Sequence, residues 1–319
     1  MLKILLVKTS SLGDVIHQLP AVTDIRTHFP DARVDWVVEE NFAELPALHP
    51  GVSRVIPVAV RRWRRALLNP ASWREMTAFR HALQGLRYDL ILDSQGLIKS
   101  AAISLLAPGP RCGFDRASAR EPIAALAYDK TISIPKNLHA VERNRRLAGR
   151  ALGYEPESPV DYGVATPQTE LPWLGAQPYV VLLHATSRAD KEWPESNWLE
   201  LAAHLHASGL RCILPWGSPK EQARSERLAA QMMNAVVAQR LNLTQAAALL
   251  GNARAVVGVD TGLTHLAAAL KVPVVALYCA SESGLTGVYS AGPAVNLGQA
   301  GQVPQPAEVI AALSGVMAA

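Results

Sequence analysis

Short runs of Val, Ile and Leu alternate along this chain with longer segments in which apolar residues recur at helical spacing. Such an alternation is typical of parallel sheets covered by helices on both faces. The expected strands span 3–8, 33–38, 53–58 and 88–93 in the first half, and 179–184, 211–215, 235–239, 255–259 and 273–278 in the second. The expected helices span 14–28, 70–86, 97–106, 137–152, 195–208, 218–232, 244–251 and 261–270, with a short terminal helix within 304–319.

The length of 319 residues favours two domains, because single hydrophobic cores stop growing at about 250–300 residues. Residues 153–178 contain five prolines without clear periodicity and are interpreted as a linker. We therefore predict two Rossmann-like, doubly wound α/β domains, residues 1–160 and 161–319, with the last helix a candidate to pack back on the first domain. Such sheets bind ligands beyond the carboxyl ends of their strands, so we expect the two domains to face each other across an active-site cleft.

Composition excludes several classes of protein. Hydrophobic residues make up 49% and charged residues 18%, which favours a globular chain, and no apolar run is long enough to span a membrane. The start lacks the features of a secretion signal, so a cytoplasmic protein is expected. The three cysteines, Cys112, Cys212 and Cys279, lack metal-ligand spacing, so we expect reduced thiols and no metal site.

The positive charge is concentrated in the first half. Residues 1–165 carry 22 Lys and Arg against 17 Asp and Glu, whereas residues 166–319 carry 9 against 10. Four arginines, Arg61, Arg62, Arg64 and Arg65, contribute much of this excess. They indicate either a solvated loop or a surface for an anionic ligand. Nucleic acid is disfavoured, because only 6% of residues are aromatic and no basic stripe interleaves with them.

The turn between the first strand and the first helix contains Lys8, Ser10, Ser11, Gly13 and Asp14. A small, glycine-containing turn lets the backbone approach a ligand, and the helix N-terminus favours negative charge. Asp14 is compatible with two roles: an acid that caps the helix, or an ionised carboxylate that accepts a proton from an attacking hydroxyl.

Three turns in the second half are candidates for a common phosphate site. Asp260, Thr261, Gly262 and His265 open an apolar helix after a strand, which indicates either diphosphate binding at the helix N-terminus or a plain cap with a structural histidine. Two other turns also follow strands. In one, Thr186, Ser187 and Lys191 would bind the same diphosphate or be solvated; in the other, Glu221 would bind a ribose or favour its helix start.

These turns belong to motifs that together resemble the ADP-heptose:lipopolysaccharide heptosyltransferases along nearly the whole chain. The RRWRR loop and the KTSSLGD start favour the members that add the first heptose over those that add the second. The matching segments are KTSSLGDVIHQLPA (8–21), DWVVEE (35–40), RVIPVAVRRWRRA (54–66), DSQGLIKSA (93–101), AREP (119–122), HAVER (139–143), DKEWPESNW (190–198), LPWGSP (214–219) and VDTGLTHLAAAL (259–270).

The resemblance implies a GT-B glycosyltransferase that moves L-glycero-D-manno-heptose from ADP-heptose to a Kdo residue of Kdo-lipid A, with inversion and no obligatory metal or cofactor. It implies that Asp14 is the catalytic base. Donor contacts would be Thr186, Ser187, Lys191, Glu221, Leu241, Asp260, Thr261, Gly262 and His265. Acceptor contacts would be Ser10, Ser11, Gly13, Arg61, Arg62, Arg64, Arg65 and Arg120.

We also expect a monomer, held by its basic loop in peripheral contact with the cytoplasmic face of the inner membrane. Two departures from the family pattern affect the donor side: Leu241 replaces an expected methionine, and residues 278–282 replace a Gly-Pro-Thr turn. The alternatives are a transferase of the same family that adds the second heptose or uses another nucleotide sugar, and a nucleotide-binding regulatory protein without transferase activity.

Overall fold

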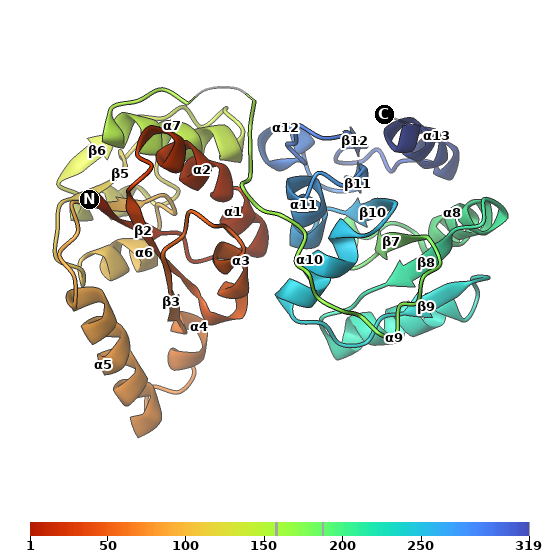
Figure 1. Ribbon diagram of the computed structural model, residues 1–319, viewed down its shortest axis with the longest axis horizontal. Coiled ribbons are helices and arrows are strands. Elements are labelled where there is room, and N and C mark those ends of the chain that lie inside the picture. Colours follow the sequence, from red (N-terminus) through yellow and green to blue (C-terminus); the bar gives the residue numbers. More distant parts are fainter. Residues whose placement is uncertain (157–158, 187, 319) are drawn as a thin grey trace. The chain divides into compact units, whose positions relative to one another are not determined.

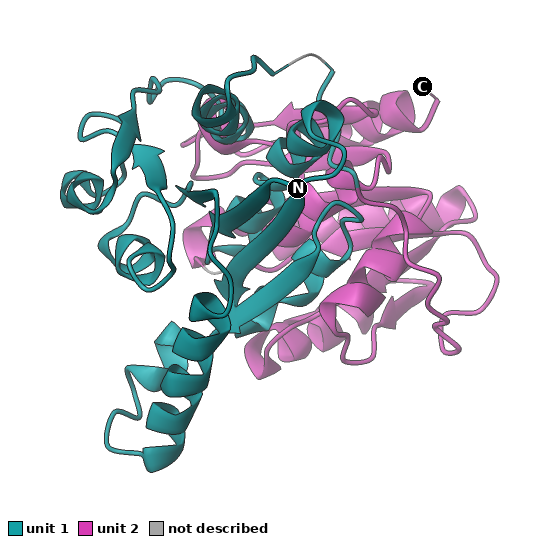
Figure 2. Ribbon diagram, turned by 60° about the vertical axis from the view of Figure 1, so that its left-hand side comes forward, with its two compact units in different colours: residues 1–163 teal, residues 164–319 magenta. Residues whose placement is uncertain are grey.

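A computed structural model describes residues 1–156, 159–186 and 188–318. The chain divides into two compact units, Met1–Gly163 and Val164–Ala319, coloured separately in Figure 2. The division lies three residues beyond the predicted boundary between 160 and 161 and falls inside the predicted linker.

The N-terminal unit is built on one six-stranded parallel sheet, in the order β3-β2-β1-β4-β5-β6 (Figure 1). This is the Rossmann order, in which the chain leaves the first strand in one direction and later returns to its other side. The carboxyl ends of β1 and β4 therefore mark the switch point where such sheets bind ligands. The strands are β1 (Lys3–Val7), β2 (Arg33–Glu39), β3 (Arg54–Val58), β4 (Leu90–Asp93), β5 (Arg111–Phe114) and β6 (Lys130–Ile132).

Helices connect these strands and bury apolar side chains against the sheet. A core cluster joins Leu5 of β1 and Ile91 of β4 to Phe79 and Leu83 of a long helix. The helices are α1 (Leu12–Ile16), α2 (Leu19–His28), α3 (Glu44–Ala47), α4 (Val60–Trp63), α5 (Pro70–Gln84), α6 (Ile98–Ser104) and α7 (Ala140–Leu152), with 3-10 turns η1 (Glu40–Phe42) and η2 (Pro122–Ala127).

The C-terminal unit repeats the plan with a parallel sheet in the order β12-β11-β10-β7-β8-β9. Counted from its own first strand, β7, this is the same Rossmann order, and its switch point lies between β7 and β10. The strands are β7 (Tyr179–Leu183), β8 (Arg211–Leu214), β9 (Ala235–Val237), β10 (Ala255–Val259), β11 (Val274–Leu277) and β12 (Ala294–Leu297).

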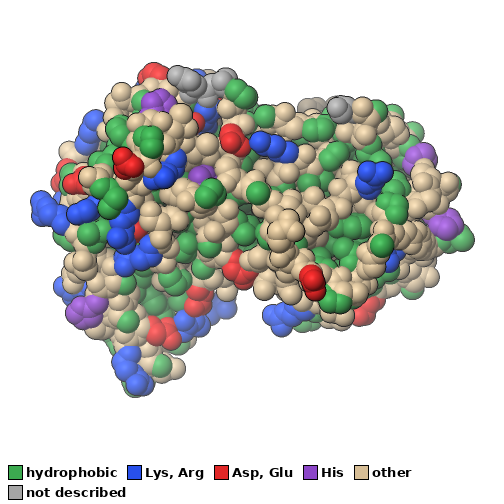
Figure 3. All heavy atoms as spheres, viewed as in Figure 1, with side chains coloured by type: hydrophobic (Ala, Val, Ile, Leu, Met, Phe, Trp, Pro, Cys, Tyr) green, Lys and Arg blue, Asp and Glu red, His purple; other side chains and the backbone are tan. Residues whose placement is uncertain are grey.

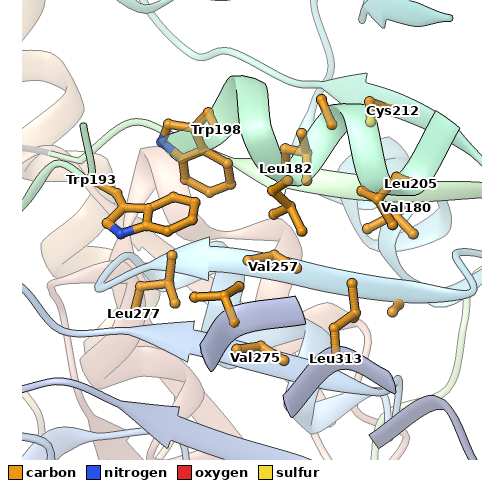
Figure 4. Close-up of a cluster of buried hydrophobic side chains, with 14 of the residues drawn as sticks. Val180, Leu182, Trp193, Trp198, Leu205, Cys212, Val257, Val275, Leu277 and Leu313 are labelled. Carbon is orange, nitrogen blue, oxygen red and sulfur yellow. The ribbon is translucent and has the colours of Figure 1, made fainter. Parts of the chain in front are cut away.

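The core of this unit includes the last helix of the chain. Trp193 and Trp198 meet edge to face, with ring centroids 4.9 Å apart (Figure 4). Leu313 of the last helix lies in the same cluster, so this helix packs on the core of the C-terminal unit; whether it also packs back on the N-terminal domain stays a prediction. The helices are α8 (Glu195–Ala207), α9 (Pro219–Ala229), α10 (Leu243–Gly251), α11 (Gly262–Ala269), α12 (Ser283–Thr286) and α13 (Pro306–Ala318), with a 3-10 turn η3 (Ala189–Lys191).

The predicted fold class is confirmed for each unit, with local corrections. The helix expected over 14–28 is two helices, because Pro20 has no N–H to donate and its ring clashes with the carbonyl four residues earlier. The strands β5, β6 and β12 were not expected; they are only three or four residues long, and Gly, Lys, Thr or Asn interrupts their apolar residues. No helix in the described part of the chain is long and apolar enough to cross a membrane.

Candidate functional site

Polar residues gather at the switch point of each sheet. In the N-terminal unit they follow β1 and β4, and in the C-terminal unit they follow β7, β8 and β10.

Asp14 lies in the first turn of α1, and its surroundings fit both roles that the sequence left open, a helix cap and a carboxylate that accepts a proton. Its Oδ2 accepts the backbone N–H of Ser11 at 2.8 Å and the Ser11 hydroxyl at 3.2 Å, so it caps the helix. The side chain is still 23% exposed, and Arg120 Nη1 lies 3.5 Å from the same oxygen. Capping therefore fixes one carboxylate oxygen of Asp14 and leaves the carboxylate accessible to a ligand.

Lys8 supports this turn from inside the sheet. Its Nζ donates to the backbone carbonyl of Ser94 at 2.7 Å and to Asn144 Oδ1 at 3.3 Å. Gln95 Oε1 accepts the backbone N–H groups of Thr9 and Ser10, each at 3.1 Å. The end of β4 and the helix α7 thus hold the turn after β1 in place.

Burial lowers the pKa of Lys8 to about 8, an effect that the charges of Asp14 and Asp93 partly offset. Burying the charged ammonium therefore costs folding free energy, and we expect a Lys8→Met variant to show this cost. Between pH 8 and 10.5 the unfolded chain binds more protons at this site than the folded one, so wild-type stability rises with pH relative to the variant by about 3 kcal/mol in total. Unfolding free energies from denaturant titrations at pH 7.5 and 10.5 measure the change, and parallel pH profiles of the two proteins would contradict it.

Two further basic residues converge on the same edge. Lys99 Nζ donates to the Ser10 hydroxyl at 2.8 Å. Arg120 follows a loop that passes close to Gly96, whose φ of +64° is available to glycine at little cost; a Cβ there would lie 3.3 Å from the Arg120 amide nitrogen. The edge around Asp14 is therefore positively charged.

We call residues 61–65, which begin in α4, the arginine loop; it has a paired and an unpaired part. Arg62 forms ion pairs of 2.9 Å with Glu40 and 2.8 Å with Glu75. Arg61, Arg64 and Arg65 instead line a common hollow of about 320 Å³. The face drawn in Figure 3 shows more basic side chains over the N-terminal unit than over the C-terminal one. Binding of an anion by Arg62 stays a prediction, and its charge is already matched within the chain.

In the C-terminal unit, Asp260 is the centre of a hydrogen-bonded cluster at the start of α11. Its Oδ2 accepts Lys191 Nζ at 2.6 Å and the Ser281 hydroxyl at 2.8 Å, while His265 Nε2 lies 3.9 Å from Oδ1. Burial alone would raise the pKa of Asp260, but the neighbouring His265, Lys191 and Ser281 outweigh it and hold that pKa well below its usual range. The carboxylate is ionised and fixes Lys191 at the strand ends.

A pocket of about 390 Å³ adjoins the ends of β7 and β8. Thr186 and Glu221 both line it, and the Thr186 hydroxyl donates to the backbone carbonyl of Asp260 at 2.9 Å. Glu221 Oε2 accepts the backbone N–H of Gly217 at 2.7 Å. The pocket and the Asp260 cluster are thus joined through Thr186. Its lining also includes Ser218, Lys220 and Arg224.

Of the remaining predicted donor residues, two lie at the start of α11 and one lies in a loop. Thr261 is the N-cap residue of α11 and makes no side-chain capping bond, and Gly262 is the first helical residue. Leu241 lies half-buried in the loop between β9 and α10, outside the lining of the pocket. Ser187 lies outside the described residues.

Several residues of these groups were not predicted from the sequence. Ser281 lies in the turn that departs from the family pattern, yet its hydroxyl reaches Asp260. Lys99 and Gln95 lie in the motif at 93–101, and the position of that motif directly after a strand was the available signal. The position of a motif in the chain does not show which of its side chains point towards the end of the neighbouring strand.

Two doubly wound units with hydroxyls, a lysine and a helix N-terminus at the strand ends define a class of nucleotide-binding α/β proteins. Residues 76–309 match the family model of glycosyltransferase family 9 (heptosyltransferase). The chain belongs to this family, as its motifs predicted. It is 48% identical over 291 residues to lipopolysaccharide heptosyltransferase 1 of Escherichia coli K12, covering 90% of this chain and 91% of that protein.

Solved structures agree with this assignment. The chain is similar to the E. coli heptosyltransferase WaaC with ADP, at a TM-score of 0.92 and 44% identity, covering 98% of this chain and 99% of that one. It is also similar to the same enzyme with ADP-2-deoxy-2-fluoro heptose, at a TM-score of 0.89 and 43% identity, with the same coverage. The GT-B type of fold predicted from the motifs is thereby confirmed.

A metal site was not expected. Among the described residues, no group of three or more His, Cys, Asp or Glu side chains is placed to hold a metal ion.

Proposed function

We propose that this protein transfers L-glycero-D-manno-heptose from ADP-heptose to a Kdo residue of Kdo-lipid A, with inversion at the anomeric carbon. The observation that carries the proposal is the likeness to WaaC along almost the whole chain, including its structure with a fluorinated ADP-heptose. The two clusters of polar residues provide groups for each half of this reaction.

The C-terminal unit would bind the donor. Lys191 and the Thr186 hydroxyl lie beside the start of α11, whose N-cap residue Thr261 makes no side-chain capping bond, and the backbone N–H groups of Thr261 and Gly262 would add to them. These groups would stabilise the charge that develops on ADP as the glycosidic bond breaks. The adjoining pocket, with Glu221 on its wall, would hold the nucleoside, and Glu221 would accept hydrogen bonds from ribose hydroxyls.

The N-terminal unit would bind the acceptor. Arg120, Lys99 and the arginine loop suit the carboxylates of Kdo and the phosphates of lipid A, because guanidinium groups bind such anions with a planar pair of donors. Asp14 would accept the proton of the Kdo hydroxyl as its oxygen attacks the anomeric carbon. The oxygen–carbon bond forms on the face opposite the departing ADP, and this geometry accounts for inversion. ADP keeps the electron pair of the broken bond.

Kdo-lipid A is anchored in a bilayer, so we further propose that the protein works as a peripheral protein at the cytoplasmic face of the inner membrane, as a monomer. The excess of arginine in the N-terminal unit supports this, since each Arg near an anionic surface contributes about 1 kcal/mol to attraction.

Mass detection of the product tests the proposed function. Purified protein, ADP-heptose and Kdo-lipid A are expected to give an acceptor heavier by one heptose, with equal yield in the presence of a chelator. Parallel reactions with an acceptor that already carries the first heptose, and with other nucleotide sugars, separate the related transferases. Binding of ADP-heptose without any transfer would instead favour a regulatory protein.

A further inference from the structure

The segment between α4 and the first turn of α5 exposes large apolar side chains. Leu68 is 99% exposed, Trp73 is 59% exposed and Leu67 is 53% exposed. Exposed apolar residues scattered singly are normal, but three within seven positions form a patch. Figure 1 shows α5 reaching past the strands of the N-terminal unit. We call Leu67, Leu68 and Trp73 the apolar tip.

Local hydrogen bonds connect the tip to the start of α5. The indole Nε1–H of Trp73 donates to the backbone carbonyl of Leu67 at 2.7 Å, which ties the helix to the preceding loop. The side chain of Asn69 accepts the N–H of Ala71 at 2.9 Å, and Pro70 begins α5 at a position that suits proline. Because the indole N–H is already bonded, the ring enters an apolar medium without losing a hydrogen bond to water.

Arginines flank the tip on both sides. Residues 60–80 contain six arginines and one acidic residue, Glu75, which is bound to Arg62. Arg64 and Arg65 precede the tip directly and Arg74 follows it; within the described part of the chain these three form no ion pair, and their charge is left unmatched. Apolar side chains and a tryptophan bordered by unpaired arginines match the boundary between acyl chains and anionic headgroups.

We propose that the apolar tip inserts into the headgroup region of an anionic phospholipid bilayer. Leu67, Leu68 and Trp73 enter the acyl boundary, while Arg64, Arg65 and Arg74 contact lipid phosphates. The inference deepens the proposed function, since it assigns the membrane contact to particular residues. The three apolar residues of the tip are separate from acceptor recognition, because they lie outside both polar clusters, whereas Arg64 and Arg65 belong to both surfaces.

Vesicle binding tests the tip without any transfer assay. Wild-type protein is expected to co-sediment with phosphatidylglycerol-containing vesicles, more weakly with neutral phosphatidylcholine vesicles and more weakly at high salt. The triple variant L67S/L68S/W73S is expected to bind about tenfold less or weaker still. A matched control, M233S/L285S/M317S, removes three exposed apolar residues of the C-terminal unit and is expected to bind like wild type.

Fluorescence and activity complete the test. Brominated lipids are expected to quench emission in the wild type but much less in a W73F variant, which keeps the tip apolar. The triple variant is expected to lose most activity on Kdo-lipid A in vesicles and to keep wild-type activity on a water-soluble, deacylated acceptor. Equal vesicle binding by wild type and triple variant, or equal loss on both acceptors, would overturn the proposal. Vesicle binding through the tip by a protein without transferase activity would overturn only the proposed function.

Discussion

An Asp14→Asn variant is expected to turn over about 100- to 10,000-fold more slowly than the wild type, with nearly unchanged affinity for ADP-heptose. The amide still accepts the Ser11 backbone N–H that the carboxylate accepts at 2.8 Å, so the first turn of α1 remains capped. It has no basic oxygen for the proton of the attacking hydroxyl. Steady-state rates on Kdo-lipid A, with donor binding measured by calorimetry, separate the two effects.

Glu121 offers a matched control for the capping role. Its Oε2 accepts the backbone N–H of Ile98 at 2.6 Å at the start of α6, a contact like that of Asp14 with Ser11. Glu121→Gln is therefore expected to retain wild-type turnover and similar thermal stability. If Asp14→Asn also kept wild-type turnover, Asp14 would be a capping residue only and another base would be required.

The sequence predicted the central strands well because their apolar residues follow one another almost without interruption. β1, β7 and β10 are continuous apolar runs buried on both faces, and the turns that follow them were correctly placed at strand ends. The short strands β5 and β6 at one edge were missed. β5 is held by pairing with β4, and β6 by pairing with β5, which is information that no local window contains.

Within the candidate site, the sequence predicted positions better than contacts. It placed Asp260, Thr261 and Gly262 at the start of a helix, as the structure does. It did not predict that Lys191, separated from Asp260 by 69 positions, donates to that carboxylate, nor that Lys8 points into the sheet. Such contacts depend on how parallel strands are ordered, because neighbours at a switch point come from distant parts of the chain.

A Lys191→Ala variant is expected to lower turnover about 100- to 1,000-fold, the range found when one donor that stabilises a developing charge is removed. Lys191 is the ammonium group fixed at the start of α11, through a bond of 2.6 Å to Asp260. Its loss would leave the departing diphosphate without that charge. Asp260→Asn is expected to act through Lys191: it would release the ammonium from its position, and so lower turnover and weaken binding of ADP-heptose.

The double variant distinguishes this coupling from two independent effects. If Asp260 positions Lys191, then K191A/D260N is expected to be little worse than K191A alone, whereas independent residues would multiply their losses. Arg188→Ala is the control for charge in the same loop; Arg188 is exposed and paired with Asp190, so a small effect is expected. If the losses in kcat multiply, Asp260 contacts the donor separately. A Lys191→Ala rate near that of wild type would mean that the ammonium does not assist departure of the diphosphate.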